Sequence, residues 1–302
     1  MKDKDKVSYD EYLELVKQQV AIRTGTRVEL QKSTKNNGLV MDGLMIVSEG
    51  SNVAPMIYLN NSYEEFLEHG IEVVVEQVIA VYEANKEDNP FNFDVSILIE
   101  FSKVKPLIKM KLINYEKNVD LLKDVVHRKE LDLAVVFMIV LESKENDDLS
   151  GTILIRRELF DLWEISEDTL YQVAKDNMKN SFETTSLNSL IYTVMKQFGI
   201  EGFPVSNPLF ELYVLTTSSR LNGAVGMLQT GLLKAFMQKH NVEQLIIFPS
   251  SVHEVLLFPY RSEVAKDNLY EMVREINTKE LKEVDFLSNN VYLFDGESLE
   301  IF

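Results

Sequence analysis

The spacing of apolar residues predicts two amphipathic helices in the first third of the chain. Apolar side chains recur every three or four residues over residues 8–23, and Ser8 and Glu11 have the spacing of a capping box. A longer periodic run covers residues 62–86, and Gly70 is the point where it divides. We therefore expect a capped helix at the start of the chain and a longer, interrupted helix after it.

Between these helices, three short runs alternate apolar and polar residues. They cover residues 27–31, 39–48 and 53–59, and turn-forming residues separate them at residues 35–38 and 49–52. Alternation with a period of two is typical of strands that bury one face. The pattern predicts a three-stranded antiparallel meander.

In the middle of the chain, strand and helix patterns alternate. Residues 109–114 and 152–156 each predict a strand, residues 118–124 a short helix, and residues 166–178 a helix with a Ser N-cap and an acidic first turn. Residues 133–142 are apolar on both faces and rich in β-branched side chains. That composition predicts a central strand covered on both sides, paired with the strand at residues 152–156.

The last third of the chain repeats this alternation. Residues 181–186 are interpreted as a linker, and residues 187–198 as a helix. The pattern then predicts helices over residues 231–240 and 265–277 and strands over residues 212–216, 223–228, 244–248, 255–259, 291–294 and 299–302.

The predicted strands follow one another too closely for parallel crossovers, which need a dozen or more residues. This predicts an α+β fold with antiparallel sheets and packed helices. We expect three parts: residues 1–94 with the meander, a middle lobe at residues 95–185 and a C-terminal lobe at residues 186–302. The two lobes share an order of strand, helix, strand, strand and helix, which raises duplication as a hypothesis.

Composition and charge restrict the possible partners. The chain has 302 residues, of which 45% are hydrophobic, and 48 Asp and Glu against 31 Lys and Arg give a net charge of −17. This charge disfavours binding to nucleic acids and to anionic membranes. There are 0 cysteines, which excludes disulfides and a Cys nucleophile. Without an apolar run of about 18 residues, we expect a soluble cytoplasmic protein.

Several phrases together resemble a known family. Their order and spacing is similar to a bacterial domain-of-unknown-function family, the one numbered 5688, over nearly the whole chain. The resemblance implies a shared fold and no activity. The phrases that carry it are Lys35–Gly38, Gly43–Leu44, Ala54–Asn60, Lys111–Asn114, Asp132–Phe137, Leu212–Thr216, Asn222–Ala224 and Pro249–Glu254.

One predicted turn contains residue types that are used in catalysis. Ser250, Ser251, His253 and Glu254 fall between two predicted strands, and they could combine a nucleophile with an oriented imidazole. The alternative is a polar hairpin turn whose Ser side chains bind backbone groups. A hydrolase that uses Ser251, His253 and Glu254 is one hypothesis that this turn allows.

Five asparagines, together with Ser250, are candidates for binding rather than catalysis. Asn36 and Asn37 stand in a turn that could offer backbone N–H groups to an anion, although a hairpin turn also explains them. Asn222 precedes a Gly that allows close backbone approach. Asn114 and Asn118 lie in and just after one of the phrases above.

No other function has a motif in this sequence. The four histidines lack the spacing of metal ligands, and no Gly-rich phosphate loop is present, so we expect no metal and no cofactor. The sequence therefore favours a non-catalytic binding or regulatory module that acts on a protein partner. The alternatives are the hydrolase and an acidic inhibitor, or nucleic-acid mimic, that binds a basic partner enzyme.

Overall fold

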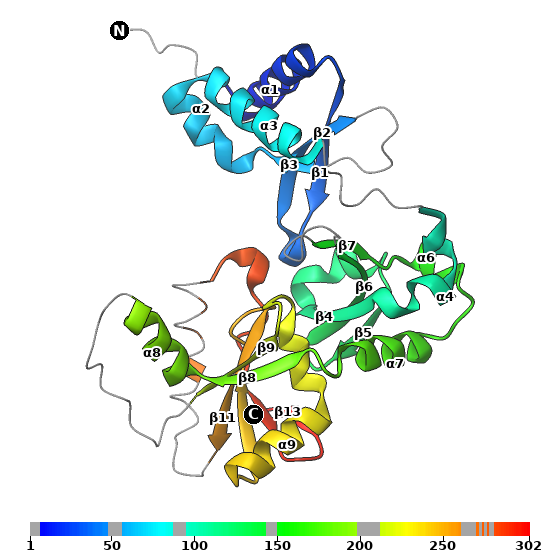
Figure 1. The fold of residues 1–302 in the computed structure, drawn as a ribbon, viewed down its shortest axis with the longest axis vertical. Helices are drawn as coiled ribbons and strands as arrows, with labels where there is room; N and C mark the ends of the chain where they lie inside the picture. The colour runs from blue at the N-terminus through cyan, green and yellow to red at the C-terminus, as the bar shows by residue number, and fades with distance from the viewer. Residues whose placement is uncertain are drawn as a thin grey trace. The chain divides into compact units, whose positions relative to one another are not determined.

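The chain forms two compact units in this computed structural model (Figure 1). The first comprises Met1–Ile97 and Leu141–Gly151, and the second comprises Leu98–Val140 and Thr152–Phe302. Helices and antiparallel sheets together confirm the expected α+β fold. The three-part division of the chain stays a prediction. The structure describes residues 7–47, 56–86, 95–142, 150–197, 212–260, 270–271, 274, 277 and 281–302.

The first unit combines the predicted meander with the predicted helices. Strands β1, β2 and β3 pair antiparallel in that order, so the meander is confirmed. Gly70 adopts φ 88° between α2 and α3, which explains why the long helical pattern divides there. The elements are α1 (Tyr9–Thr24), β1 (Arg27–Thr34), β2 (Val40–Val47), β3 (Met56–Tyr58), α2 (Tyr63–His69) and α3 (Ile71–Lys86).

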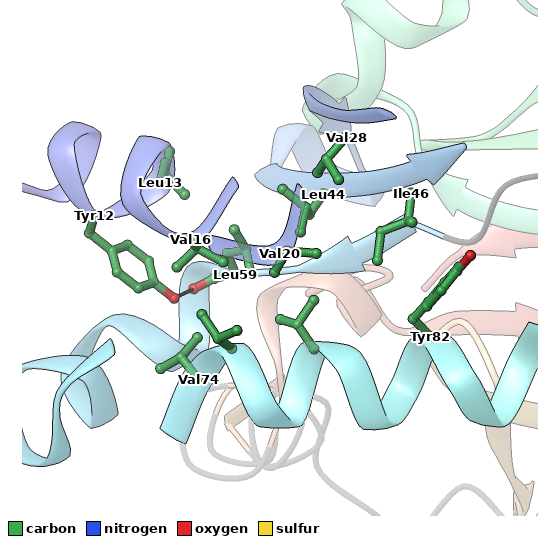
Figure 2. Packing of buried hydrophobic residues seen from close by; sticks show 12 residues of the cluster. Tyr12, Leu13, Val16, Val20, Val28, Leu44, Ile46, Leu59, Val74 and Tyr82 are labelled. Atoms are coloured by element: carbon green, nitrogen blue, oxygen red, sulfur yellow. Dashed lines mark hydrogen bonds between the residues drawn. The ribbon is translucent and has the colours of Figure 1, made fainter. Parts of the chain in front are cut away.

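The predicted capping box begins α1. The Glu11 backbone N–H donates to the Ser8 hydroxyl, and the Ser8 N–H donates to the Glu11 carboxylate at 2.8 Å. The helix then places its apolar face against the meander and α3. Figure 2 shows Tyr12 and Val74 facing each other across this core, with the Tyr12 hydroxyl donating to the Leu59 carbonyl at 3.2 Å.

The middle sheet opens the second unit. Strand β6 lies between β4 and β5, and β7 also pairs with it, so the predicted central strand is confirmed. Its buried side chains agree with its apolar sequence. The strands are β4 (Ile108–Asn114), β5 (His127–Glu130), β6 (Leu133–Glu142) and β7 (Ser150–Leu154), and the helices are α4 (Phe101–Val104), α5 (Val119–Leu122), α6 (Arg157–Asp161) and α7 (Glu167–Met178).

Helix α7 packs against the middle sheet through β4. Ser166 caps it as predicted, accepting the Thr169 N–H at 3.1 Å. At the other end, the Asn177 side chain donates to the Ile108 carbonyl at 2.8 Å. These contacts fix α7 beside the sheet.

The C-terminal sheet has the order β13-β12-β10-β11-β9-β8, and every pair in it is antiparallel. Figure 1 shows β8 and β9 side by side in this sheet, although the helix α8 separates them in sequence. The elements are β8 (Phe182–Ser186), α8 (Leu187–Gln197), β9 (Tyr213–Thr217), α9 (Thr230–His240), β10 (Gln244–Phe248), β11 (Glu254–Tyr260), β12 (Tyr292–Phe294) and β13 (Leu299–Ile301).

Two sequence predictions in this region are wrong. Residues 181–186 are no linker, because Phe182–Ser186 forms β8 and pairs antiparallel with β9, and its two threonines favour the strand conformation. Gly223–Leu228 is no strand but a 3₁₀ helix, η7. It follows Asn222, whose φ of 56° turns the chain out of the extended conformation.

The two lobes share an element order but pair their strands differently. In the middle lobe the first strand, β4, pairs with the next long strand, β6, whereas in the C-terminal lobe β9 pairs with β11. The pairing therefore does not repeat. The predicted helix at residues 265–277 lies mostly outside the described residues. No helix among the described residues is long and apolar enough to span a membrane.

Candidate functional site

The turn between β10 and β11 brings together the three predicted catalytic candidates, Ser251, His253 and Glu254, and the binding candidate Ser250. The Ser250 hydroxyl donates to the Glu254 carboxylate at 3.3 Å, and the Ser251 N–H donates to the Glu254 carbonyl at 3.1 Å. The His253 N–H donates to the Ser251 hydroxyl oxygen at 3.0 Å. Both serines therefore bind groups within their own turn, as a polar hairpin turn predicts.

The His253 ring has a partner at each nitrogen. Nδ1 lies 3.2 Å from the backbone N of Asn222, and Nε2 lies 3.2 Å from an Asp285 oxygen. A backbone N–H can only donate, so Nδ1 accepts. Nε2 then carries the ring proton and donates a hydrogen bond to the Asp285 carboxylate.

This arrangement differs from that of an activated serine. A general base needs a free nitrogen lone pair directed at the hydroxyl, and the nitrogen remote from the carboxylate serves that role in Ser-His-Asp sites. In this turn the Asn222 N–H occupies that nitrogen. Ser251 is buried, and its oxygen faces the His253 backbone rather than the ring.

The same turn joins three other segments of the second unit. The His253 carbonyl accepts the Thr216 hydroxyl at 2.8 Å and the Gly223 N–H at 2.9 Å. The Val252 N–H donates to the Asp285 carbonyl at 2.9 Å, in the 3₁₀ helix η8 (Glu283–Asp285). The turn thereby connects β9, η7 and η8.

Asn114 and Asn118 also lie together, at the end of β4. The Asn118 side chain donates to the Asn114 carbonyl at 2.8 Å. The Asn114 side chain accepts the Lys117 N–H at 2.9 Å and donates to the Leu287 carbonyl at 2.9 Å. Both side chains stabilise the backbone where the middle lobe meets the segment before β12.

Asp132 is the centre of a hydrogen-bond network that the sequence did not indicate. Its carboxylate accepts hydrogen bonds from Ser288 Oγ at 2.6 Å, Asn290 Nδ2 at 3.0 Å and Tyr292 Oη at 2.8 Å. Burial, and then the charge of Asp132, raises the pKa of Tyr292, so the phenol stays a donor. Asp132 therefore links the β5–β6 turn to the strand β12 and the residues before it through hydrogen bonds.

Asn36 and Asn37 belong to the first unit. They lie in the 3₁₀ turn η1 (Asn36–Gly38) between β1 and β2, where Asn37 is buried and adopts φ 61°. This geometry agrees with a hairpin turn. An anion-binding role for these residues stays a prediction.

A cavity of about 250 Å³ lies within the second unit, beside the turn that Asp132 fastens. The β5–β6 turn, α7, the junction of η7 with α9, and the hairpin β12–β13 all contribute to its lining. Its polar lining includes Glu130, Tyr171 and Lys175, and its apolar lining includes Leu133, Met227, Leu228, Phe294 and Leu299.

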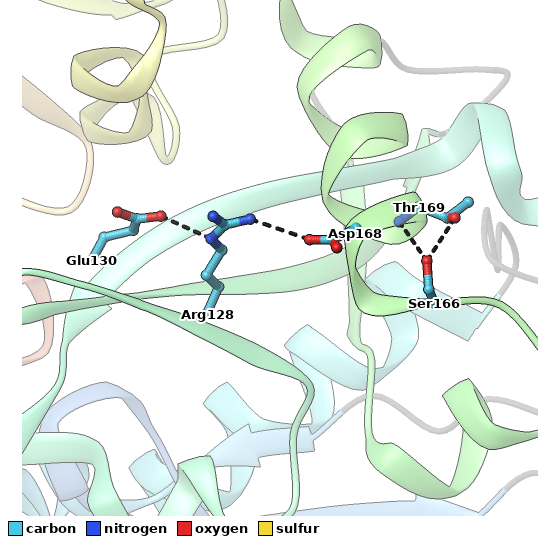
Figure 3. A network of polar contacts seen from close by, with 5 residues as sticks. All are labelled: Arg128, Glu130, Ser166, Asp168 and Thr169. Carbon is cyan, nitrogen blue, oxygen red and sulfur yellow. Dashed lines mark hydrogen bonds and ion pairs between the residues drawn. The ribbon is translucent and has the colours of Figure 1, made fainter. Parts of the chain in front are cut away.

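Arg128 pairs with Glu130, one of the residues that line this cavity. Figure 3 shows Arg128 between two carboxylates, with 3.0 Å to Glu130 and 3.5 Å to Asp168. Its guanidinium also lies 4.7 Å from the centre of the Tyr171 ring. Burial raises the pKa of Tyr171, so this ring stays neutral above its usual range.

Within the described residues, no group of three His, Asp or Glu side chains could hold a metal ion. A family model described as a family of unknown function, DUF5688, matches residues 9–296. The chain belongs to the DUF5688 family. The family is described as one of unknown function, so membership in DUF5688 assigns no activity to the chain. No curated protein and no solved structure matches the chain.

Proposed function

We propose that this DUF5688 protein is a non-catalytic binding or regulatory module. The observation that carries the proposal is the state of His253, whose ring nitrogens both have partners within the fold. A hydrolase that used Ser251 and His253 would need one of those nitrogens for its nucleophile. The turn instead serves to join strands and 3₁₀ helices.

The cavity of the second unit supports a binding role. Its lining combines six apolar residues with Glu130, Tyr171, Lys175 and Thr230, and a mainly apolar lining with a few polar groups is typical of ligand sites. A cytoplasmic location and a protein partner stay predictions from the sequence.

The proposal is tested by turnover assays on the purified protein. The wild type, Ser251→Ala and His253→Ala variants are incubated with generic esters, phosphomonoesters and nucleotides. We expect all three to be equally inactive. Turnover by the wild type that Ser251→Ala abolishes would overturn the proposal, and circular dichroism of Ser251→Ala shows whether that variant is folded.

A further inference from the structure

We infer that the cavity of the second unit binds a small amphipathic carboxylate, with Lys175 as the partner of the anionic head. This inference rests on the proposed binding function and gives it a ligand class. Lys175 and Tyr171 are one turn apart on α7, and both line the cavity.

The charges around the cavity determine the sign of the ligand. Glu130 is paired with Arg128 at 3.0 Å, and Arg128 also contacts Asp168 at 3.5 Å, so the guanidinium offsets part of the Glu130 charge. Lys175 Nζ contacts the neutral Tyr171 ring, 5.9 Å from its centre. Among the described residues, no carboxylate oxygen lies within 4.0 Å of this ammonium. The cavity therefore has one cation available for an anionic partner.

The rest of the lining selects an apolar body. Leu131, Leu228 and Leu299 come from three different segments, line the same space and keep part of their surface exposed. Burying aliphatic surface against them is favourable, whereas a second charge on the ligand would lose its hydration without a partner.

The size of the cavity limits the length of the ligand. Its volume of about 250 Å³ is below the roughly 300–1,000 Å³ of sites for drug-sized molecules. A straight-chain carboxylate with about eight carbons is a suitable probe.

Hydrogen bonds hold the β5–β6 turn that forms one side of the cavity. Leu131, also in the lining, holds φ 58°, a conformation that costs an L-residue energy and persists only where its surroundings impose it. The adjacent Asp132 supplies that restraint through its three hydrogen bonds to Ser288, Asn290 and Tyr292.

The test compares three probes that share a chain and differ in charge. Isothermal titration calorimetry measures the affinity of the full chain for octanoate, 1-octanol and octylamine. We expect octanoate to bind roughly tenfold to a hundredfold more tightly than octanol, and octylamine to bind most weakly. Equal affinity for octanoate and octanol, or no binding of octanoate, would overturn the inference.

Variants locate the binding in the cavity. Lys175→Met keeps the aliphatic stem and removes the charge, so octanoate affinity should fall to that of octanol while octanol affinity stays. Lys179→Met removes an exposed lysine just after α7, outside the lining, and should change neither. An unchanged octanoate affinity in Lys175→Met would contradict the assignment.

A second pair of variants tests the inference even if Lys175→Met fails to fold. Leu299→Glu adds a negative charge to the lining, and Leu299→Gln is its uncharged counterpart. Octanoate should bind more weakly to the Glu variant than to the Gln variant, and equal affinities would overturn the inference. Turnover in the enzyme assays would instead overturn the proposed function, so the two failures are distinguishable.

Discussion

Replacing Asp132 with alanine should destabilise the second unit severely. The carboxylate accepts three hydrogen bonds, and two of its donors, on Ser288 and Tyr292, are only 1% and 0% exposed. A buried donor left without a partner costs about 1–3 kcal/mol. With two such donors stranded and the Asn290 bond lost, we expect a loss of about 3–5 kcal/mol in the free energy of unfolding.

Urea unfolding followed by tryptophan fluorescence measures this loss. The chain has one tryptophan, Trp163, which is buried in the second unit and donates to the Leu98 carbonyl at 2.7 Å. Its emission therefore reports on that unit, and we expect Asp132→Ala to lower the midpoint by about 1–2 M urea. Asp124→Ala is the control, because its ion pair with Arg156 is exposed and worth less than about 1 kcal/mol. A midpoint for Asp132→Ala equal to that of the control would refute the reasoning.

Two further predictions concern a close backbone approach and a buried phenol. A Cβ at Gly223 would lie 2.6 Å from the Thr216 Cα, so Gly223→Ala should lower the free energy of unfolding of the second unit by about 2 kcal/mol or more. The control is Gly231→Ala, whose Cβ would stand in open space and which should be neutral or stabilising. Urea unfolding measures both variants. Burial raises the pKa of Tyr12 from 10.0 to about 12 in the folded state, so the first unit holds this proton more tightly than the unfolded chain and loses stability as pH rises from about 10 to 12. Circular dichroism across that range should show a shallower loss for Tyr12→Phe, and an identical slope would contradict the account.

Local signals made most elements predictable from the sequence. The capping box of Ser8 and Glu11 and the break at Gly70 depend only on neighbouring residues. The central position of β6 follows from its double-sided apolar pattern. Where a partner far along the chain decides the structure, the predictions failed: Phe182–Ser186 becomes a strand only because β9 lies beside it.

Short polar segments were missed for a similar reason. The sequence of β5, His127–Glu130, has no apolar alternation, and its pairing with β6 decides its conformation. Gly223–Leu228 has the apolar content of a strand, but it forms a 3₁₀ helix after the positive φ of Asn222, a conformation that the apolar pattern does not reveal.

The candidate sites show the same division. The turn at residues 250–254 could be found because its polar residues are adjacent in sequence. Asp285 lies 32 residues from His253, and nothing distinguishes it among 48 acidic residues. Lys175 and Leu133 meet in one cavity only after the second unit has folded.

The tautomer of His253 tests the central claim most directly. A two-bond nitrogen–proton correlation spectrum of the nitrogen-15-labelled protein, at a pH where histidines are neutral, distinguishes the two ring nitrogens. The signal is assigned by its loss in His253→Gln, since the chain has four histidines. The account predicts a single tautomer with the proton on Nε2 and an accepting Nδ1. A proton on Nδ1 with a free Nε2, the form in which a catalytic base is held, would contradict it.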